Sequence, residues 1–389
     1  MSSRKDADLL VIGGGILGAF HAYHAINRGF RVILIERDSR PRGATVRNFG
    51  QIVPSGMDPH WQQYGRESLK IYQALQNRCD LTVKMEGSIY LASNQDELQL
   101  LEELATINKE NSYRSELWTP EKCRERYPQL RREYCKGGLF FPDEISVNPR
   151  QMIHRVHQLL SKCVNFVSHF NTSVKECSVN DNGVVVAVTA ENQKYNARRA
   201  IICSGHDLQT LFPDVYRSSD LQLVQLQMLR TRPLPQVLVP GNVLTGLTIR
   251  RYESFHQCPS WSDIRSRWQP DPFQQQFGIH LLFKQELDGS MIVGDSHQYT
   301  EARYPDDLPL GQQTVINEYM LAKAQEIFSL PSWDLEESWT GIYSQTSDIK
   351  GYFSHRIDNH IHLLTGIGGK GMTAGPGFAK AYLNEVFDD

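Results

Sequence analysis

The stretch DLLVIGGGILGAFHAYHAINRGFRVILIE, from Asp8 to Glu36, has the layout of one complete βαβ nucleotide-binding unit. It opens with the apolar run Leu9 to Ile12, which is typical of a buried parallel strand. A glycine turn follows, then a helix that ends near Gly29, then a second apolar strand from Arg31 to Ile35. This order predicts a doubly wound α/β domain with a parallel sheet.

Three glycines in the turn have the G-x-G-x-x-G spacing. The first permits a tight turn, the second lets the backbone approach a pyrophosphate, and the third lets the helix pack closely on the sheet. Glu36 ends the second strand, where its carboxylate would accept hydrogen bonds from both hydroxyls of a ribose. An empty crevice is the alternative, but it would leave Glu36 as an unpaired acid beside a buried strand. The nucleotide contacts predicted in this unit are Gly13, Gly15, Ile16, Gly18, Glu36 and Arg37.

The composition of the 389 residues excludes several classes of protein. A net charge of -3 and the lack of a basic tract give no reason to expect nucleic acid or an anionic membrane as partner. No apolar stretch reaches about 18 residues, so we expect no membrane span. The amino terminus leads straight into the first strand, which leaves no room for a signal peptide and predicts a cytoplasmic protein. Nothing in the pattern specifies an oligomeric state.

The seven cysteines are scattered and never have C-x-x-C spacing. Their odd number and spacing argue against a disulfide framework and against a zinc site. We therefore expect a reduced protein without a metal.

A second loop of small residues follows Glu36, in RDSRPRGATVRNFGQIVPSG. Residues 43–45 are small enough for close approach to a ligand, and Arg47, Asn48 and Gln51 place polar groups within reach of it. A nicotinamide-dependent dehydrogenase would continue here with another βαβ repeat, so the second loop favours FAD over NAD.

The elements after this loop break the βαβ rhythm. We expect a helix over 58–78, a strand over 83–92, a helix over 95–109, and a short helix from Pro120. The fold predicted is α/β with an α+β second domain, a Rossmann-like FAD-binding domain interleaved with an antiparallel-sheet substrate domain. The FAD-binding domain comprises residues 1–82, 142–217 and 335–389, and the substrate-binding domain comprises residues 83–141 and 218–334.

The dipeptide Asp288-Gly289 predicts a hairpin between strands 279–287 and 290–298. A two-residue turn would pair Lys284 with Val293 and His280 with His297. Because side chains alternate along strands, this register places His280, Lys284, Asp295 and His297 on one face, a credible anion site in a cleft. A solvated face of an antiparallel sheet is the alternative.

The carboxyl-terminal part contains a second strand, glycine turn and helix. An apolar strand over 362–364 leads into TGIGGKGMT at 365–373, and a helix is expected from about Pro376. The turn and the helix amino terminus again form an anion trap. Lys370 in this turn is either a surface lysine or a contact to the cofactor or the oxygen site.

The strings GATVRNFG, GDSHQY and GGKGMT make the chain resemble the superfamily of glycine oxidase, D-amino-acid oxidase and sarcosine oxidase. The similarity is greatest to a bacterial subgroup associated with aminophosphonate catabolism. The resemblance implies non-covalent FAD, since relatives with covalent flavin have a cysteine at the position of Gly341. The further cofactor contacts that it implies are Gly43, Ala44, Thr45, Asn48, Phe49, Gly50, Gln51, Val174, Ser204, Gly205, Gly341, Gly368, Gly369, Lys370, Gly371, Met372 and Thr373.

The chain departs from its relatives at one functional position. Relatives that oxidise α-amino acids grip the substrate carboxylate with an arginine, at the position of Tyr343 here. A terminal amine with a distant phosphonate would need basic donors elsewhere. The substrate-binding candidates are Arg250, Arg251, Tyr252, His280, His297 and Tyr343, and the catalytic candidates are His297, Lys370 and Asn48.

The resemblance implies an amine oxidase that acts on 2-aminoethylphosphonate or its N-methyl or hydroxylated derivative. The imine formed would hydrolyse to an aldehyde, phosphonoacetaldehyde for the parent amine, and O2 would be reduced to H2O2. Two alternatives stay open at this point. One is a flavin dehydrogenase of amino acids, hydroxy acids or glycerol phosphate that passes electrons to a carrier or quinone, and the other is a flavoprotein without catalytic activity or an RNA-modification partner.

Overall fold

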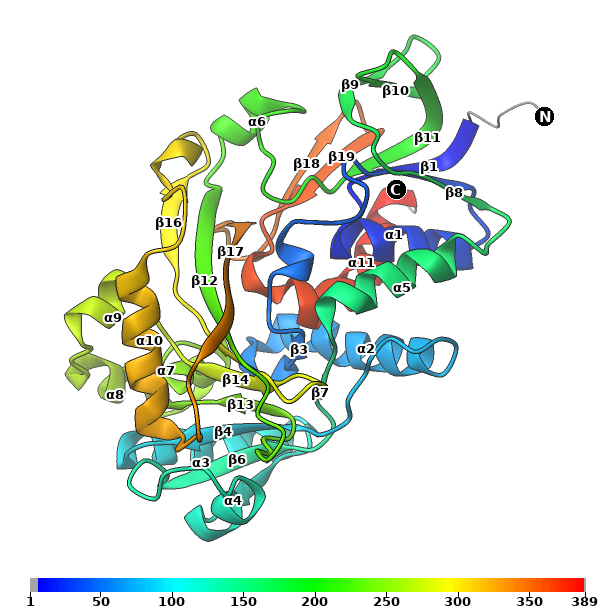
Figure 1. Cartoon of the computed structure of the whole chain (residues 1–389). Coiled ribbons are helices and arrows are strands. Elements are labelled where there is room, and N and C mark those ends of the chain that lie inside the picture. The colour runs from blue at the N-terminus through cyan, green and yellow to red at the C-terminus, as the bar shows by residue number, and fades with distance from the viewer. Residues whose placement is uncertain (1–5, 388–389) are drawn as a thin grey trace.

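The computed structural model describes residues 6–387, which form two large sheets and one two-stranded sheet (Figure 1). The first sheet has the strand order β18-β19-β11-β1-β2-β8. In addition, β10 pairs antiparallel with β11, and β9 pairs antiparallel with β10. Its strands are β1 (Asp6–Ile12), β2 (Val32–Ile35), β8 (Phe166–His169), β9 (Val174–Val179), β10 (Val185–Thr189), β11 (Lys194–Ile202), β18 (Phe353–Ile357) and β19 (Ile361–Thr365).

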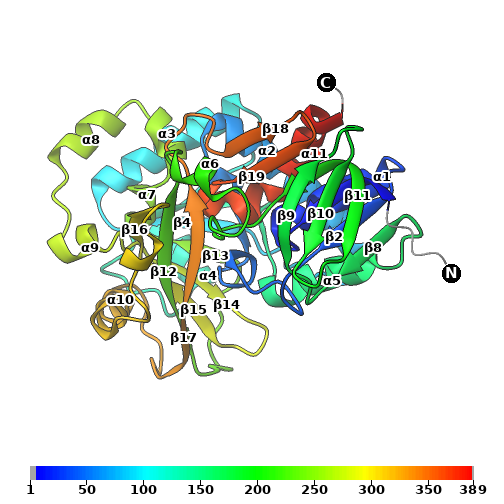
Figure 2. The same ribbon diagram turned by 90° about the horizontal axis from the view of Figure 1, so that it is seen from above.

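Strand β1 lies at the centre of this sheet because its side chains are apolar on both faces. Leu9 and Val11 pack into a core with the helices, while Leu10 and Ile12 pack on the opposite face with β9, β10 and β11. Helices α2 and α11 lie beside each other in both views (Figures 1 and 2). The helices of this domain are α1 (Ile16–Asn27), α2 (Pro59–Gln76), α5 (Pro149–Leu160), α6 (Pro213–Arg217) and α11 (Gly371–Phe387).

The second sheet has the order β16-β12-β15-β14-β13-β4-β6-β5, and β17 pairs with the free side of β12. Its strands are β4 (Ser88–Ala92), β5 (Glu116–Trp118), β6 (Gly137–Phe141), β12 (Gln222–Thr231), β13 (Asn242–Leu244), β14 (Leu282–Gln285), β15 (Met291–Gly294), β16 (Gln298–Glu301) and β17 (Leu335–Gln345). Its helices are α3 (Gln95–Glu110), α4 (Pro120–Arg126), α7 (Gly246–Ile249), α8 (Trp261–Arg267), α9 (Pro272–Gln276) and α10 (Thr314–Ile327). The short strands β3 (Gln51–Ile52) and β7 (Ile145–Ser146) pair with each other.

The predicted α/β fold with interleaved parallel and antiparallel sheets is confirmed. The boundary expected at residue 335 falls inside the second sheet, because β17 pairs with β12 along residues 335–345. Among residues 6–387, no helix combines the length and apolar character needed to cross a membrane.

The register predicted for the hairpin at Asp288-Gly289 is wrong by one residue. Glu286 donates its N–H to the carbonyl of Ser290 at 2.9 Å, so the loop has three residues and not two. Gly289 occupies the left-handed region with φ +85°, as the last residue of such a loop requires. Lys284 therefore lies opposite Ile292.

Helix α11 begins at Gly371, five residues before the predicted start at Pro376. Proline favours a first helical turn, but it lies inside this helix. Its carbonyl accepts a hydrogen bond from Nε2 of His24 at 2.9 Å. The earlier start brings the helix amino terminus directly to the glycine turn.

Glu144 makes stability depend on pH. Its carboxyl is fully buried and accepts hydrogen bonds from Ser55 N at 2.8 Å and Tyr113 Oη at 2.7 Å. Burial raises its pKa from the ordinary value of 4.5 to about 7. The folded state therefore holds this proton more tightly than the unfolded state. The stability that Glu144 contributes is complete below pH 4.5 and is lost as pH rises to about 7.

We expect Glu144→Gln to gain stability relative to wild type by up to about 3 kcal/mol between pH 4.5 and 7.5, because the amide cannot ionise. Urea unfolding of both proteins at four pH values, with equal FAD, measures the difference. Parallel stability curves would contradict the assignment.

Candidate functional site

A cavity of about 1160 Å³ runs from the glycine turn after β1 to the second sheet. A typical site for one drug-sized ligand measures about 300–1,000 Å³, so this cavity has room for a dinucleotide and a small molecule. Both domains contribute to its wall. The site is therefore built where the two sheets meet.

The three glycines of the turn have distinct structural roles. Gly13 has φ +104°, and a Cβ there would lie 2.3 Å from the carbonyl oxygen of Cys203. A Cβ at Gly18 would lie 1.9 Å from the carbonyl oxygen of Gly13, so Gly18 serves packing and does not line the cavity. Gly15 lines the cavity at the amino end of α1. Ile16 N donates to Thr45 Oγ1 at 2.9 Å, which brings the second loop to this helix terminus.

Glu36 is held at the end of β2 by the backbone. Its Oε2 accepts from Gly14 N at 2.6 Å and its Oε1 accepts from Asp38 N at 3.0 Å. The carboxylate lines the cavity although the residue is only 8% exposed. Arg37 beside it donates to Asp207 Oδ2 at 2.6 Å, and Val174 lines the same end.

The second anion trap lies at the amino end of α11. Residues 367–373 all line the cavity. Nζ of Lys370 lies 3.2 Å from Glu253 Oε1 and 5.4 Å from the centre of the Trp61 ring. Thr373 Oγ1 accepts from Val53 N and donates to Gln51 O, which ties this terminus to the second loop.

The cavity fits FAD on its own geometry. A glycine turn with no side chains, a positioned acid and two helix amino termini lie along one continuous wall. The residues that would hold FAD are Gly13, Gly15, Ile16, Glu36, Arg37, Gly43, Ala44, Thr45, Phe49, Gln51, Val174, Ser204, Gly205, Gly341, Gly368, Gly369, Lys370, Gly371, Met372 and Thr373.

We expect Glu36→Ala to weaken FAD binding by about 1–3 kcal/mol, because ribose hydroxyls would be left unpaired. Titration of apoprotein with FAD measures the loss, and Glu176→Ala removes the same charge from an exposed position on β9 as control. Equal affinity in both variants would remove Glu36 from the site. Acid or heat should release intact FAD, since Gly341 offers no thiol for a covalent bond.

Two predicted contacts in the second loop serve the loop itself. The Asn48 amide donates to the carbonyls of Ala44 and Thr45, both at 2.9 Å, and its Oδ1 accepts from Gly50 N at 2.7 Å. The amide therefore shapes the loop, and because Asn48 also lines the cavity its catalytic role stays a prediction. Gly50 does not line the cavity, and a Cβ there would lie 2.1 Å from Val147 O.

Neighbouring arginines at the substrate end have different environments. Arg250 is buried, with its Nε 2.8 Å from Glu97 Oε1 and its guanidinium over the Trp268 ring. This ion pair already engages its guanidinium, so its role as a substrate ligand stays a prediction although the residue lines the cavity. Arg251 donates to Tyr299 Oη at 2.8 Å, and no carboxylate of residues 6–387 lies within 4.0 Å of it. Arg251 is thus a cation available to a ligand here.

The structure brings His280, Asp295 and His297 together at the same end. The imidazole rings stack with centres 5.3 Å apart, and His280 Nε2 lies 3.0 Å from Asp295 Oδ1. His297 Nδ1 donates to the carbonyl of Gly278 at 3.1 Å. Burial lowers the pKa of both histidines, that of His297 to about 3, so both are neutral at physiological pH.

Lys284 does not join this cluster, contrary to the face predicted for it. Its Nζ donates to the carbonyls of Phe49 and Val147 at 2.7 Å each, and it pairs with Glu286 at 2.8 Å. The residue is 2% exposed and lies outside the cavity wall. Lys284 lies four residues along the chain from His280, so its side chain reaches two carbonyls of the first domain and not the cluster.

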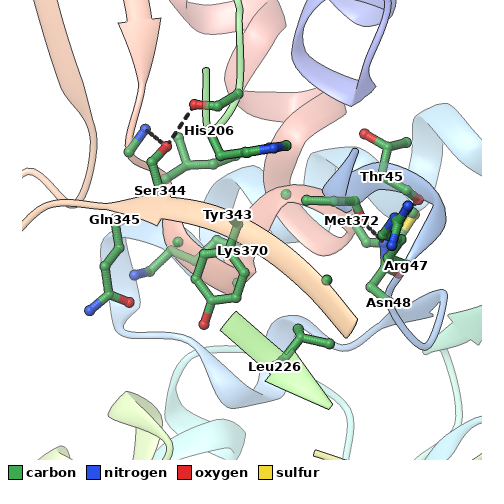
Figure 3. A pocket seen from close by; sticks show the side chains of 18 of the residues that line it. Thr45, Arg47, Asn48, His206, Leu226, Tyr343, Ser344, Gln345, Lys370 and Met372 are labelled. Atoms are coloured by element: carbon green, nitrogen blue, oxygen red, sulfur yellow. Dashed lines mark hydrogen bonds between the residues drawn. The ribbon is translucent and has the colours of Figure 1, made fainter. Parts of the chain in front are cut away.

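Tyrosines complete the substrate end. Figure 3 shows Tyr343 of β17 pointing into the cavity, with Thr45, Arg47 and Asn48 gathered to one side. Burial raises the pKa of Tyr343 and of Tyr252, so both remain hydroxyls. Tyr299 was not predicted, although it lies two residues after His297 and so shares its face of the strand.

The chain is similar in sequence to flavin-dependent oxidoreductases along nearly its whole length. A family model described as "DAO: FAD dependent oxidoreductase" matches residues 8–384. One of the subunits of opine oxidase from Rhizobium meliloti is 20% identical over 357 residues, which cover 88% of this chain and 83% of that protein. Mitochondrial sarcosine dehydrogenase of Mus musculus is 25% identical over 215 residues, which cover 51% of this chain and 22% of that protein.

Solved structures share the fold across both domains. Glycine oxidase from Geobacillus kaustophilus matches with a TM-score of 0.74 at 17% identity, over 98% of this chain and 95% of that one. Dithionite-reduced L-α-glycerophosphate oxidase from Mycoplasma pneumoniae, which has FAD bound, matches with a TM-score of 0.77 at 16% identity, over 98% of this chain and 94% of that one.

Proposed function

The chain belongs to the DAO family of FAD-dependent oxidoreductases, and from that premise we propose that it oxidises a small amine bearing an anionic group. The proposed substrate is 2-aminoethylphosphonate or its N-methyl or hydroxylated derivative. The resulting imine hydrolyses to an aldehyde, phosphonoacetaldehyde for the parent amine, and O2 is reduced to H2O2.

The proposal rests mainly on Arg251. Its guanidinium lines the cavity with Tyr299 Oη as its hydrogen-bond partner and forms no ion pair within 4.0 Å among residues 6–387. A guanidinium binds a phosphonate or carboxylate through two parallel hydrogen bonds. Tyr343 stands where the resemblance leads one to expect the carboxylate arginine, so the anion would bind from a different direction.

FAD supplies the two-electron oxidation of the amine. The chain orients the substrate and keeps water away. Arg251 and Tyr299 would fix the anionic end, and Tyr252 and Tyr343 would enclose the middle of the molecule. His297 is a weak base, because burial lowers its pKa to about 3, so its role toward the amine is to accept a hydrogen bond at its unprotonated Nε2.

A phosphate-bearing alcohol is the second candidate substrate. Arg251 would bind its phosphate in the same way, and L-α-glycerophosphate oxidase has the same fold. In this case the chain would act as a hydroxy-acid or glycerol-phosphate dehydrogenase that passes electrons to a carrier or quinone.

Anaerobic reduction of the bound flavin tests both candidates. The panel contains 2-aminoethylphosphonate, its N-methyl and hydroxylated derivatives, glycine, sarcosine, D-alanine and glycerol 3-phosphate. We expect an aminophosphonate to bleach the flavin at least about tenfold faster than any amino acid, the effect of one charge-assisted contact. Stoichiometric H2O2 in air would support oxidase activity. Bleaching by glycine or D-alanine without bleaching by any aminophosphonate would refute the proposal.

A further inference from the structure

The carboxylate of Asp295 is buried without a hydrogen bond. The residue follows β15, lines the cavity and is 8% exposed. Within residues 6–387 no N–H or O–H group is aligned to donate to its buried Oδ1. His280 Nε2 is near Oδ1 at 3.0 Å but is not aligned for a hydrogen bond. A buried carboxylate normally has partners, so a donor is missing from this site.

The two histidines do not supply that donor. The proton on His297 Nδ1 is directed to the carbonyl of Gly278, and this nitrogen lies 3.9 Å from Asp295 Oδ1. His280 Nδ1 lies 3.3 Å from Thr248 Oγ1 on the other side of its ring. Both rings are buried and neutral, so neither provides a full positive charge.

Arg251 faces the same cavity and does not pair with Asp295 within 4.0 Å. The cavity therefore contains a carboxylate and a guanidinium that attract each other through space but form no direct ion pair within 4.0 Å. A ligand with one cationic and one anionic end would satisfy both groups at once.

We infer that Asp295 binds the ammonium group of the substrate and that Arg251 binds its anion, so the site selects amines that carry both charges. The inference rests on the proposed function only for the chemical identity of the anion. Asp295 fixes the nitrogen, and His280 and His297 stack beside it as neutral supports.

A metal ion is the competing occupant. One ligand atom from each of His280, Asp295 and His297 lies within 4.8 Å of the others. His297 Nδ1 is already engaged with Gly278 O, so a metal at that nitrogen would have to break this hydrogen bond. The ammonium explanation leaves every observed contact in place.

Binding of three probes to Asp295→Asn separates these explanations. The probes are 2-aminoethylphosphonate, propylphosphonate, in which a methyl replaces the ammonium, and propylamine, which lacks the anion. For probes that the enzyme oxidises, the dissociation constant comes from the concentration dependence of anaerobic flavin reduction. For probes that it does not oxidise, the constant comes from the change in the flavin spectrum on binding. Asp263→Asn on the exposed surface of α8 is the control.

We expect Asp295→Asn to weaken the binding of 2-aminoethylphosphonate and propylamine about 10- to 100-fold, while the binding of propylphosphonate stays the same. Arg251→Met should weaken the binding of both phosphonates and leave the binding of propylamine unchanged. Unchanged constants for both amines in folded, FAD-loaded Asp295→Asn would overturn the inference. One tightly bound zinc per wild-type chain, absent from Asp295→Asn, with unchanged amine binding would also overturn it in favour of a metal site.

The wild type provides a test that does not require the variant to fold. 2-Aminoethylphosphonate should bind at least about tenfold tighter than propylphosphonate, and equal affinity would refute a role for the ammonium. If no phosphonate binds but the binding of propylamine requires Asp295, the proposed substrate is wrong and the amine site stands. If 2-aminoethylphosphonate is oxidised with equal constants in wild type and variant, the proposed function stands and the inference falls.

Discussion

Replacing Arg251 with methionine should lower kcat/KM for 2-aminoethylphosphonate by roughly 10- to 150-fold, equivalent to about 1.5–3 kcal/mol of lost charge-assisted hydrogen bonding. Methionine keeps an unbranched chain of similar length and removes only the charge and the donors. FAD should stay bound, because Arg251 lies at the substrate end of the cavity. Steady-state oxidation at several substrate concentrations measures the effect.

Arg265→Met is the matched control, since Arg265 is exposed at the edge of the same cavity. Its kcat/KM should change less than about threefold, the effect expected of a screened surface charge. Oxidation of propylamine should be insensitive to both changes. Equal losses in the two variants would mean that the overall potential of the cavity, and not a contact with Arg251, attracts the anion.

Replacing Arg250 with methionine should lower the free energy of unfolding by about 3–5 kcal/mol, because it leaves the buried Glu97 carboxylate without its partner. The two side chains are 7% and 3% exposed and their atoms lie 2.8 Å apart. Glu97 also accepts from Ser93 N and Oγ at 2.7 Å, so it cannot move away to water. Urea unfolding measures the change.

The double variant Arg250→Met/Glu97→Gln should recover most of this stability, since no unpaired charge remains. Its kcat/KM should stay within a few-fold of wild type. A large loss of activity in the stable double variant would support Arg250 as a substrate ligand.

The sequence predicted the first domain well because its signals are local. Strand, glycine spacing, helix and acid in residues 8–36 each constrain the backbone within a few positions, and the structure has all of them. The helix start predicted at Pro120 is confirmed for the same reason, because Thr119 caps that helix.

The substrate end was harder to predict because long-range geometry decides it. Arg250 and Arg251 are neighbours in sequence, and only the packing of α3 against α7 determines which one meets Glu97. Lys284 is held away from the site by long-range contacts, since its acceptors Phe49 and Val147 lie 235 and 137 residues away in the sequence. The pairing of 335–345 with β12 likewise joins segments about a hundred residues apart.

The position of Lys284 has a consequence for how molecules enter and leave. Its ammonium joins the hairpin of the second sheet to two carbonyls of the first domain and to Glu286. Swinging the domains apart would remove the two carbonyls from a buried charge and leave it with Glu286 alone, at a cost of several kcal/mol. We therefore expect substrate entry and product release to depend on local motion of the loops at the cavity entrance. The rate of product release should change with the mobility of these loops and not with motion at the interface between the sheets.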